Sequence, residues 1–174
     1  DEGYAGKDDT TEYDTMLNGV YTYFDYNHVW ARPGYPKRWH SITCQMNPFS
    51  TEIYADGERI LMGEHVLDYQ REINLKTGIL TRKYTYKLQN GKTIRLFFER
   101  FLSMKDINVG VQKIILSSNE NIEIIIKPYL TKELSNPVYA GDGRKNEKLF
   151  TEYQKFDVDG DIISGIQKLK VSNF

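Results

Sequence analysis

Hydrophobic and polar residues alternate along several short segments in the middle of the chain, between Leu67 and Leu130. A period of two places successive side chains on opposite faces of a β-sheet, so each alternating segment is typical of a strand. No window of the sequence shows helical periodicity over three turns. The pattern therefore predicts consecutive antiparallel strands at residues 68–75, 79–88, 93–104, 107–117 and 122–130.

Turn residues separate these predicted strands. Lys76-Thr77-Gly78 follows the first strand, and Asn90-Gly91 lies between the second and the third. An Asn-Gly pair favours a two-residue hairpin turn because both central residues of that turn adopt positive φ. Asp56-Gly57 indicates a further hairpin earlier in the chain. The turns therefore predict a repeated hairpin arrangement.

In two of the predicted strands the side chains divide clearly between two faces. One face of the strand at 93–104 carries apolar residues and one arginine, namely Ile94, Leu96, Phe98, Arg100, Leu102 and Met104. Phe97 and Phe101 are apolar exceptions on the opposite face, so we expect this strand to be covered on both sides. In the strand at 122–130, the inward face is predicted to consist of Ile122, Ile124 and Ile126.

The remaining sequence adds shorter strands at both ends. Further strands are predicted at residues 17–26, 49–55, 149–155, 161–168 and 170–174. Asn18-Gly19 is interpreted as a turn, residues 27–47 have no clear period, and residues 131–148 are polar and loop-like. We therefore expect an all-β fold in which residues 1–174 form a single domain, a large antiparallel β-sandwich with few or no helices.

Composition and charge limit the kinds of molecule that this chain is expected to bind. The chain has 13 Tyr, 8 Phe and 2 Trp, which predicts an aromatic core. A net charge of −1 and a pI near 6.4 give no electrostatic reason to expect nucleic acid or an anionic membrane as a partner. The single cysteine, Cys44, cannot form an internal disulfide, so the expected compartment is the cytoplasm.

Few residues suggest bond-making or metal chemistry. Residues 157–161 resemble the start of a calcium loop, but the glycine comes too early for an EF-hand and Lys168 stands where a bidentate glutamate is needed. A hairpin turn is the favoured interpretation. The three histidines and the cysteine have no spacing that links them, and the 24 acidic residues single out no pair. We therefore predict no catalytic residue, no metal site and no cofactor in this chain.

An aromatic and basic loop at residues 30–40 is the strongest candidate for a binding site. Its candidate contacts with a substrate are Trp30, Tyr35, Trp39 and His40. Aromatic faces and cationic donors suit a carbohydrate pocket. The same residue types favour contact with a neighbouring domain, and they can also anchor a long loop by hydrophobic packing. The residues alone leave these three interpretations open.

The order of several segments resembles a known family. The matching segments are Asp1-Glu2-Gly3-Tyr4-Ala5-Gly6, Asn18-Gly19-Val20-Tyr21, Gly34-Tyr35-Pro36, and residues 53–58, 67–72, 75–82 and 100–104. The most specific part comprises Leu-Asp-Tyr-x-Arg at 67–71, Gly-x-Leu-x-Arg at 78–82 and Arg-Phe-x-Ser at 100–103. The chain resembles the N-terminal domain of glycoside hydrolase family 65, which includes maltose, trehalose and kojibiose phosphorylases.

The resemblance implies a supersandwich-like β-domain that precedes a linker and a catalytic (α/α)6 barrel. It implies that the first strand or strands and the barrel, which carries the catalytic glutamate and the phosphate site, are absent from this fragment. Phosphorylases of the family cleave α-linked disaccharides with phosphate, invert the anomeric centre and need no organic cofactor. The fragment would then be inactive alone, and would contact the barrel of the same polypeptide and support the rim of the active site. Whether the parent enzyme uses phosphate or water stays open.

Two further interpretations of the chain remain. It can be an autonomous carbohydrate-binding module that uses Trp30, Tyr35 and Trp39, or an oligomerisation surface that forms a homodimer.

Overall fold

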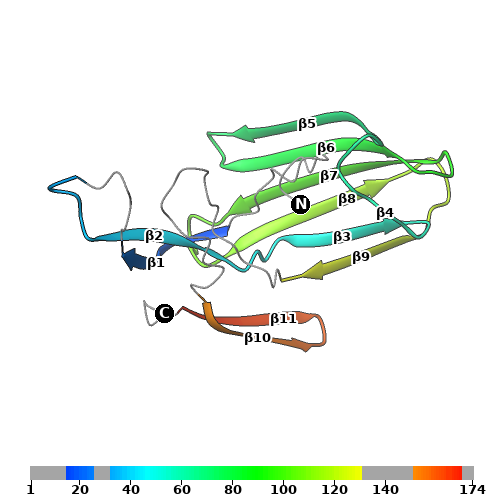
Figure 1. The fold of residues 1–174 in the computed structure, drawn as a ribbon. Helices are drawn as coiled ribbons and strands as arrows, with labels where there is room; N and C mark the ends of the chain where they lie inside the picture. Colours follow the sequence, from blue (N-terminus) through cyan, green and yellow to red (C-terminus); the bar gives the residue numbers. More distant parts are fainter. Residues whose placement is uncertain (1–14, 26–31, 131–150, 170–174) are drawn as a thin grey trace. The chain divides into compact units, whose positions relative to one another are not determined.

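The computed structural model describes residues 15–25, 32–130 and 151–169, which form eleven β-strands and no helix (Figure 1). The all-β prediction is confirmed. The strands are β1 (Thr15–Asp25), β2 (Arg38–Gln45), β3 (Ser50–Ala55), β4 (Glu58–Arg59), β5 (Val66–Asn74), β6 (Ile79–Lys87), β7 (Thr93–Leu102), β8 (Gly110–Ser117), β9 (Ile124–Tyr129), β10 (Thr151–Asp159) and β11 (Ile162–Leu169).

The chain divides into two compact units. The first contains Thr51–Pro128, and the second contains the described parts of Glu12–Ser50 and Tyr129–Phe174. In the first unit β5, β6, β7 and β8 pair in this order as an antiparallel four-stranded sheet. A second sheet has the order β4-β3-β9. The hairpin arrangement expected for the middle of the chain is therefore found in the larger sheet, whereas the assignment of residues 1–174 to one domain stays a prediction.

The core of the first unit joins residues from both of its sheets. Ile53 and Ala55 of β3 belong to the same buried cluster as Tyr84 of β6 and Leu96 and Phe98 of β7. Burial of one large apolar side chain contributes about 1.5–3 kcal/mol, so this shared cluster is the main source of stability for the unit. Ile94, Leu96 and Phe98, which the sequence pattern groups on one face, are buried, whereas Leu102 and Met104 of the same predicted face are 70% and 93% exposed.

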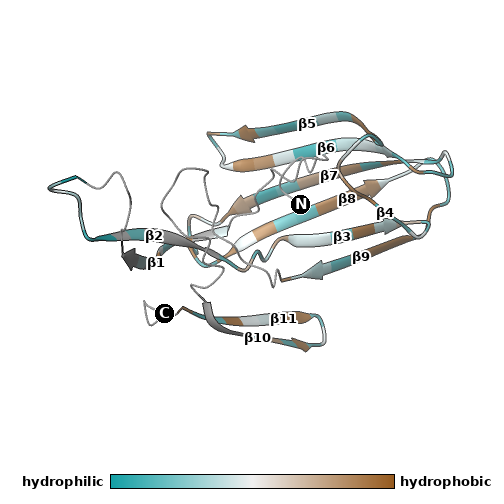
Figure 2. Cartoon of the chain, in the orientation of Figure 1, coloured by the Kyte–Doolittle hydropathy of each residue, from teal (hydrophilic) through white to brown (hydrophobic). Residues whose placement is uncertain are grey.

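The edge strand β5 is polar along most of its length. Every residue from Leu67 to Asn74 is exposed, and Figure 2 shows this strand mainly in hydrophilic colours. Charged side chains on an edge strand disfavour pairing with a strand of another molecule. The register between β5 and β6 shifts between Leu67 and Gln70, where Asp68 adopts a positive φ of 52°. Such a bulge further interrupts the edge.

The structure corrects two predictions about strand faces. The outer face of β7 is exposed at Arg95 and Phe101 but half-buried at Phe97 and Glu99, so the described residues cover that side only in part. Aromatic residues also favour strands on their exposed faces, which explains the error at Phe101. Ile122 and Ile124 pack against the core as predicted, but Ile126 is 46% exposed.

The Asp-Gly and Asn-Gly pairs form different turns. Asp56 and Gly57 both have positive φ, 47° and 81°, and connect β3 to β4 as the two-residue hairpin that the sequence predicts. At Asn90-Gly91 only the glycine has positive φ, and its backbone N–H donates to the carbonyl of Leu88 at 2.9 Å. This is a three-residue loop with a type I turn followed by a left-handed glycine. The position of this hairpin is therefore correct and its predicted turn type is wrong.

The second unit contains two strand pairs, β1 with β2 and β10 with β11. Strand β2 lies in the region 27–47, where the sequence shows no clear period. Asn18-Gly19 lies inside β1 rather than before it, at a register shift between Met16 and Tyr21. Gly19 has a φ of 84°, which is the conformation that makes glycine favourable in a bulge.

Residues 157–161 form the predicted hairpin. Asp159 pairs with Ile162, and Gly160 between them has a positive φ of 56°. Residues 131–148 and the predicted strand at 170–174 lie outside the described residues.

Candidate functional site

The four predicted site residues have different environments. Trp30 lies outside the described residues, and Trp39 is placed only by its backbone, which pairs with that of Phe24. Tyr35 is 50% exposed in a turn where its backbone N–H donates to the carbonyl of Arg32 at 3.0 Å. His40 is an exposed residue of β2. Of the four, His40 is the residue whose side-chain contacts the structure describes most fully.

His40 belongs to an exposed stack of side chains on the β1–β2 pair, which we call the aromatic stack: Tyr21, Tyr23, Arg38 and His40. The ring centroids of His40 and Tyr21 are 5.4 Å apart with an angle of 25° between the planes. The Tyr23 ring is 6.3 Å from His40, and Arg38 Cζ lies 5.0 Å from the Tyr23 centroid. Cross-strand aromatic contacts of this kind stabilise a two-stranded pair.

The register of the two strands explains the aromatic stack. Tyr23 and His40 are directly opposite in the antiparallel pair, and Tyr21 lies two residues from Tyr23 on the same strand face. Tyr21 and Tyr23 are 43% and 38% exposed. The stack therefore presents ring edges, hydroxyl groups and a guanidinium group at the surface, a combination that can contact a sugar or another protein surface.

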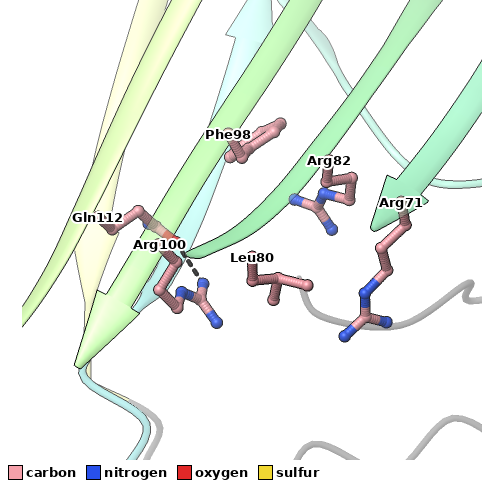
Figure 3. A pocket seen from close by; sticks show the side chains of 6 residues that line it. All are labelled: Arg71, Leu80, Arg82, Phe98, Arg100 and Gln112. Atoms are coloured by element: carbon pink, nitrogen blue, oxygen red, sulfur yellow. Dashed lines mark hydrogen bonds between the residues drawn. The ribbon is translucent and has the colours of Figure 1, made fainter. Parts of the chain in front are cut away.

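A second candidate lies in the first unit, and the sequence reasoning did not select it. We call it the arginine hollow; it is lined by Arg71, Leu80, Arg82, Phe98, Arg100 and Gln112 (Figure 3). It is open to solvent, and the space of about 260 Å³ at this site includes open solvent in front of it. The lining residues come from β5, β6, β7 and β8, one or two from each strand. All four strands of the larger sheet therefore contribute to this site.

The strand register brings the three arginines together. Arg71 of β5 pairs with Arg82 of β6, and Arg82 pairs with Phe98 of β7. Arg100 pairs with Leu80 on one side and with Gln112 of β8 on the other. Directly opposed residues of an antiparallel pair point to the same face of the sheet, so the three guanidinium groups lie on the face that also carries the core.

Burial and aromatic contact hold Arg82 in place. The residue is 7% exposed, and its Cζ atom lies 4.2 Å from the centroid of Phe98, which is 8% exposed. The same atom lies 5.8 Å from the centroid of Tyr84. A guanidinium group over an aromatic face is attracted by the ring quadrupole, and this attraction is stronger away from water. Burial raises the pKa of Tyr84 to about 12, so its ring carries a neutral hydroxyl at neutral pH.

Arg100 is joined to the neighbouring strand and to the other sheet. It donates a hydrogen bond to Gln112 Oε1, and Gln112 Nε2 donates to Thr51 Oγ1 at 3.4 Å. Burial lowers the pKa of Arg100 to about 10, which still leaves the group protonated at neutral pH. The hollow therefore presents positive charge and N–H donors, which suit the binding of an oxyanion rather than the removal of a proton.

A signal for this site was present in the sequence. Arg100 occupies an inward position in the alternating pattern of its strand, where an apolar residue is expected. Arg71, Arg82 and Arg100 are also the arginines of the three most specific segments of the family resemblance, at 67–71, 78–82 and 100–103. The three arginines lie in one hollow because their strands pair. The individual segments do not show which strands pair with one another.

The described residues also lack two features that would indicate other functions. They contain no group of three or more His, Cys, Asp or Glu residues placed to hold a metal ion. They also contain no helix with the length and apolar character needed to cross a membrane.

The described residues form antiparallel β-sheets, with an arginine-lined hollow in one unit and an aromatic stack in the other. The family model described as "Glycosyl hydrolase family 65, N-terminal domain" matches residues 1–168. The chain therefore belongs to this family, as the sequence resemblance indicates.

Several curated relatives are phosphorylases. The chain is 34% identical to the maltose phosphorylase of Bacillus subtilis over 106 residues, which are 60% of this chain and 13% of that protein. It is 25% identical to the 1,2-alpha-glucosylglycerol phosphorylase of Bacillus selenitireducens over 51% of this chain and 12% of that protein. It is 30% identical to the kojibiose phosphorylase of Halothermothrix orenii over 49% of this chain and 11% of that protein. The matched regions thus span only a small part of each relative.

Proposed function

We propose that this chain is a non-catalytic N-terminal β-domain of an α-glucoside phosphorylase that supports the rim of the active site and contacts the catalytic domain of the same polypeptide. The observation that carries the proposal is the family match over residues 1–168. The relatives named as maltose and kojibiose phosphorylases favour an α-linked disaccharide and phosphate as the substrates of the parent enzyme. The parent enzyme works in the cytoplasm, which agrees with the single cysteine.

The build of the first unit supports a scaffolding role. Its two sheets share one buried cluster, and such a core holds its surface loops in defined positions. Binding residues on a rigid scaffold need less ordering when the partner binds. A domain of this kind can therefore shape a neighbouring active site without supplying the reacting groups.

An activity assay tests the non-catalytic part of this proposal. The chain expressed alone is incubated with maltose, trehalose or kojibiose and phosphate, and the release of glucose and of sugar phosphate is followed. We expect no turnover above that of a buffer control. Turnover by the chain alone, abolished by heat denaturation, would show that the bond-breaking residues lie within it and would overturn the proposal.

Substitutions in a parent enzyme that carries this domain test the rim role. Tyr35→Ala and His40→Ala are expected to raise KM for the disaccharide several-fold and leave kcat unchanged, because loss of uniform binding affects KM alone. Tyr129→Ala is the matched control, since Tyr129 is a tyrosine with 37% exposure outside the 30–40 loop. Unchanged kinetics in both variants would remove Tyr35 and His40 from the rim.

The aromatic stack favours a second candidate function, autonomous carbohydrate binding. Its exposed tyrosine rings and the stacked His40 offer apolar surface together with polar edges. Titration of the chain with maltose, followed by intrinsic fluorescence, distinguishes the two functions. A saturable change that is lost in Tyr21→Ala supports autonomous binding, whereas the scaffold proposal expects no saturable change.

The third possibility, an oligomerisation surface, predicts a dimer by light scattering. The charged edge of β5 argues against dimer formation by strand pairing at that edge. A monomer at all concentrations measured would leave the scaffold proposal in place and exclude self-association of this chain.

A further inference from the structure

Apolar side chains gather on the outer face of β7 and β8 and on the turn that joins these strands. We call this surface the apolar hairpin: Phe97, Phe101, Leu102, Met104, Ile107, Val109, Val111 and Ile115. At its turn, Leu102, Met104 and Ile107 are 70%, 93% and 86% exposed. Figure 2 shows hydrophobic colours at the end of β7 and on parts of β8. Single apolar residues are normal at a protein surface, whereas a contiguous group of them marks a contact surface.

Strand register makes the apolar hairpin continuous. Phe97 is directly opposite Ile115, and Phe101 is directly opposite Val111. Opposed residues of an antiparallel pair share a face of the sheet, and this face points away from the core cluster. Phe101 and Val111 lie at the end of the strands next to the turn, so the outer face and the turn form one surface.

Local hydrogen bonds define the backbone of the turn. The N–H of Ser103 donates to the carbonyl of Val109 at 2.9 Å, and the N–H of Val109 donates to the carbonyl of Asp106 at 3.0 Å. The N–H of Asp106 donates to Ser103 Oγ at 2.9 Å. A turn held in this way loses little conformational freedom when a partner covers it, which favours binding.

The charges within the apolar hairpin favour a protein surface over a membrane. Glu99 lies opposite Lys113 on the outer face, and Lys105 and Asp106 lie in the turn. These two positive and two negative charges give no net attraction to an anionic membrane. On a protein partner, groups of opposite charge can pair with them.

The size of the apolar hairpin favours a partner in the same polypeptide over a second copy of this chain. Strands lie about 4.8 Å apart and rise about 3.4 Å per residue, so the outer face of β7 and β8 covers about 300 Å². The three most exposed side chains of the turn add about 100 Å² each. Separate molecules bury about 800 Å² per partner in a standard interface. A tethered domain needs less contact, because its effective concentration is in the millimolar range.

We propose that the apolar hairpin docks onto the catalytic domain of the same polypeptide. The matched regions span 13% of the maltose phosphorylase and 11% of the kojibiose phosphorylase, so these relatives contain far more chain than this domain. The proposal rests on the proposed function, which expects a catalytic domain beside this one, and it names the surface that the catalytic domain covers.

The test measures the oxidation of Met104 by hydrogen peroxide in a parent enzyme that carries this domain, followed by mass spectrometry of its peptides. Oxidation of a methionine to the sulfoxide depends on its exposure, so we expect Met104 to react at least about tenfold more slowly in the folded enzyme than in urea. In this chain alone Met104 is 93% exposed, and we expect it to react at close to the unfolded rate. Met62, which is 7% exposed, is the standard for a protected methionine.

Two variants of the parent enzyme locate the contact. Leu102→Ser combined with Ile107→Ser removes two apolar side chains from the turn and is expected to raise the oxidation rate of Met104 toward the unfolded rate. Leu75→Ser is the matched control, because Leu75 is 88% exposed on the β5–β6 turn, outside the apolar hairpin, and we expect it to leave the protection of Met104 unchanged. In this chain alone all three leucine and isoleucine side chains are exposed, so neither variant is expected to shift the urea midpoint.

Three outcomes would overturn the proposal. The first is oxidation of Met104 in the folded parent enzyme at the unfolded rate. The second is protection of Met104 in this chain alone: if it is independent of concentration, this chain covers its own hairpin, and if it rises with concentration, a second copy does. The third is equal loss of protection in Leu75→Ser and in the double variant, which would indicate a general effect of the surface.

These results are separate from the test of the proposed function. Fast oxidation of Met104 in the parent enzyme, together with no turnover by this chain alone, overturns the docking proposal and leaves the non-catalytic role in place. Turnover by this chain alone overturns the non-catalytic role, whatever the oxidation rate of Met104.

Discussion

Lys92 Nζ lies 2.7 Å from Asp56 Oδ2, and this ion pair joins two hairpin turns whose residues are 36 positions apart in the chain. Asp56 also accepts hydrogen bonds from Asn90 Nδ2 at 3.0 Å and from the backbone N–H of Glu123 at 2.9 Å. Lys92 donates a further hydrogen bond to the carbonyl of Asn121 at 2.7 Å. The β3–β4 turn, the β6–β7 turn and the segment before β9 are therefore tied together through one carboxylate.

The first prediction concerns the stability of the first unit at acid pH. The hydrogen bond from Lys92 and that from the Glu123 backbone hold the pKa of the Asp56 carboxyl below its usual range. Its stabilisation is therefore fully present above the unfolded-state pKa of about 3.9 and is lost as the pH falls through the lower folded-state pKa. We expect Asp56→Asn to lower the urea midpoint at neutral pH, with the difference vanishing at the acid end of the titration.

Asp68→Asn is the control for this prediction. Asp68 also has a positive φ and is exposed on β5, so the substitution repeats the change of side chain at a similar backbone conformation. If the urea midpoints of Asp56→Asn and the unaltered chain differ by the same amount from neutral to acid pH, the charge of Asp56 has no role in stability.

The turns show where local sequence preference is sufficient and where it is not. Asp56-Gly57 forms the turn that the dipeptide favours, because both residues tolerate positive φ. Asn90-Gly91 forms a different turn, in which the Asn90 side chain donates to Asp56 and accepts from the backbone N–H of Lys92 at 3.0 Å. The turn at Asn90-Gly91 is therefore accompanied by a contact with Asp56, and a short sequence window contains no information about such a distant contact.

The second prediction concerns the left-handed glycine of the β6–β7 turn. Gly91 has a φ of 88°, and an added Cβ meets no atom within 4 Å, so only the backbone conformation opposes a side chain. Gly91→Ala is expected to destabilise the chain by about 1–2 kcal/mol in urea unfolding. Gly63→Ala, at a site with equal space and no positive φ, is expected to be close to neutral. Equal effects of the two substitutions would contradict this explanation.

The sequence alone selects His40 of the aromatic stack, but neither its ring partners nor any residue of the arginine hollow as a site residue. His40 stacks on Tyr21 because β1 pairs with β2. Strand β2 lies within residues 27–47, which have no clear period, so the sequence did not predict it. Arg82 and Arg100 converge because β6 and β7 pair in one particular register. Strand register is decided by packing between distant segments, so neither convergence follows from local alternation.

The third prediction compares two leucines on the same face of β7. Leu96 is 1% exposed in the core cluster, whereas Leu102 at the end of the strand is 70% exposed. Leu96→Ala is expected to lower the free energy of unfolding by about 2–5 kcal/mol, because it removes transfer energy and leaves a cavity. Leu102→Ala is expected to change it by no more than about 0.5 kcal/mol. Comparable losses would mean that Leu102 is buried in solution.

The fourth prediction concerns the contact between Arg82 and Phe98 in the arginine hollow. Both residues are almost fully buried, and the guanidinium carbon lies 4.2 Å from the ring centroid. A cation–π contact is worth about 2 kcal/mol when desolvated and about 0.5–1 kcal/mol at an exposed site. Arg82 makes other interactions as well, so only a double-mutant cycle isolates this pair.

The cycle uses Arg82→Met, Phe98→Leu and the double variant, each measured by urea unfolding. We expect a coupling free energy of about 2 kcal/mol. The exposed pair Arg38 and Tyr23, with Cζ 5.0 Å from the centroid, provides the comparison and is expected to couple by about 0.5–1 kcal/mol. If the buried pair couples no more strongly than the exposed pair, Arg82 is held by its other partners, and the position of its guanidinium group in the hollow does not depend on the Phe98 ring.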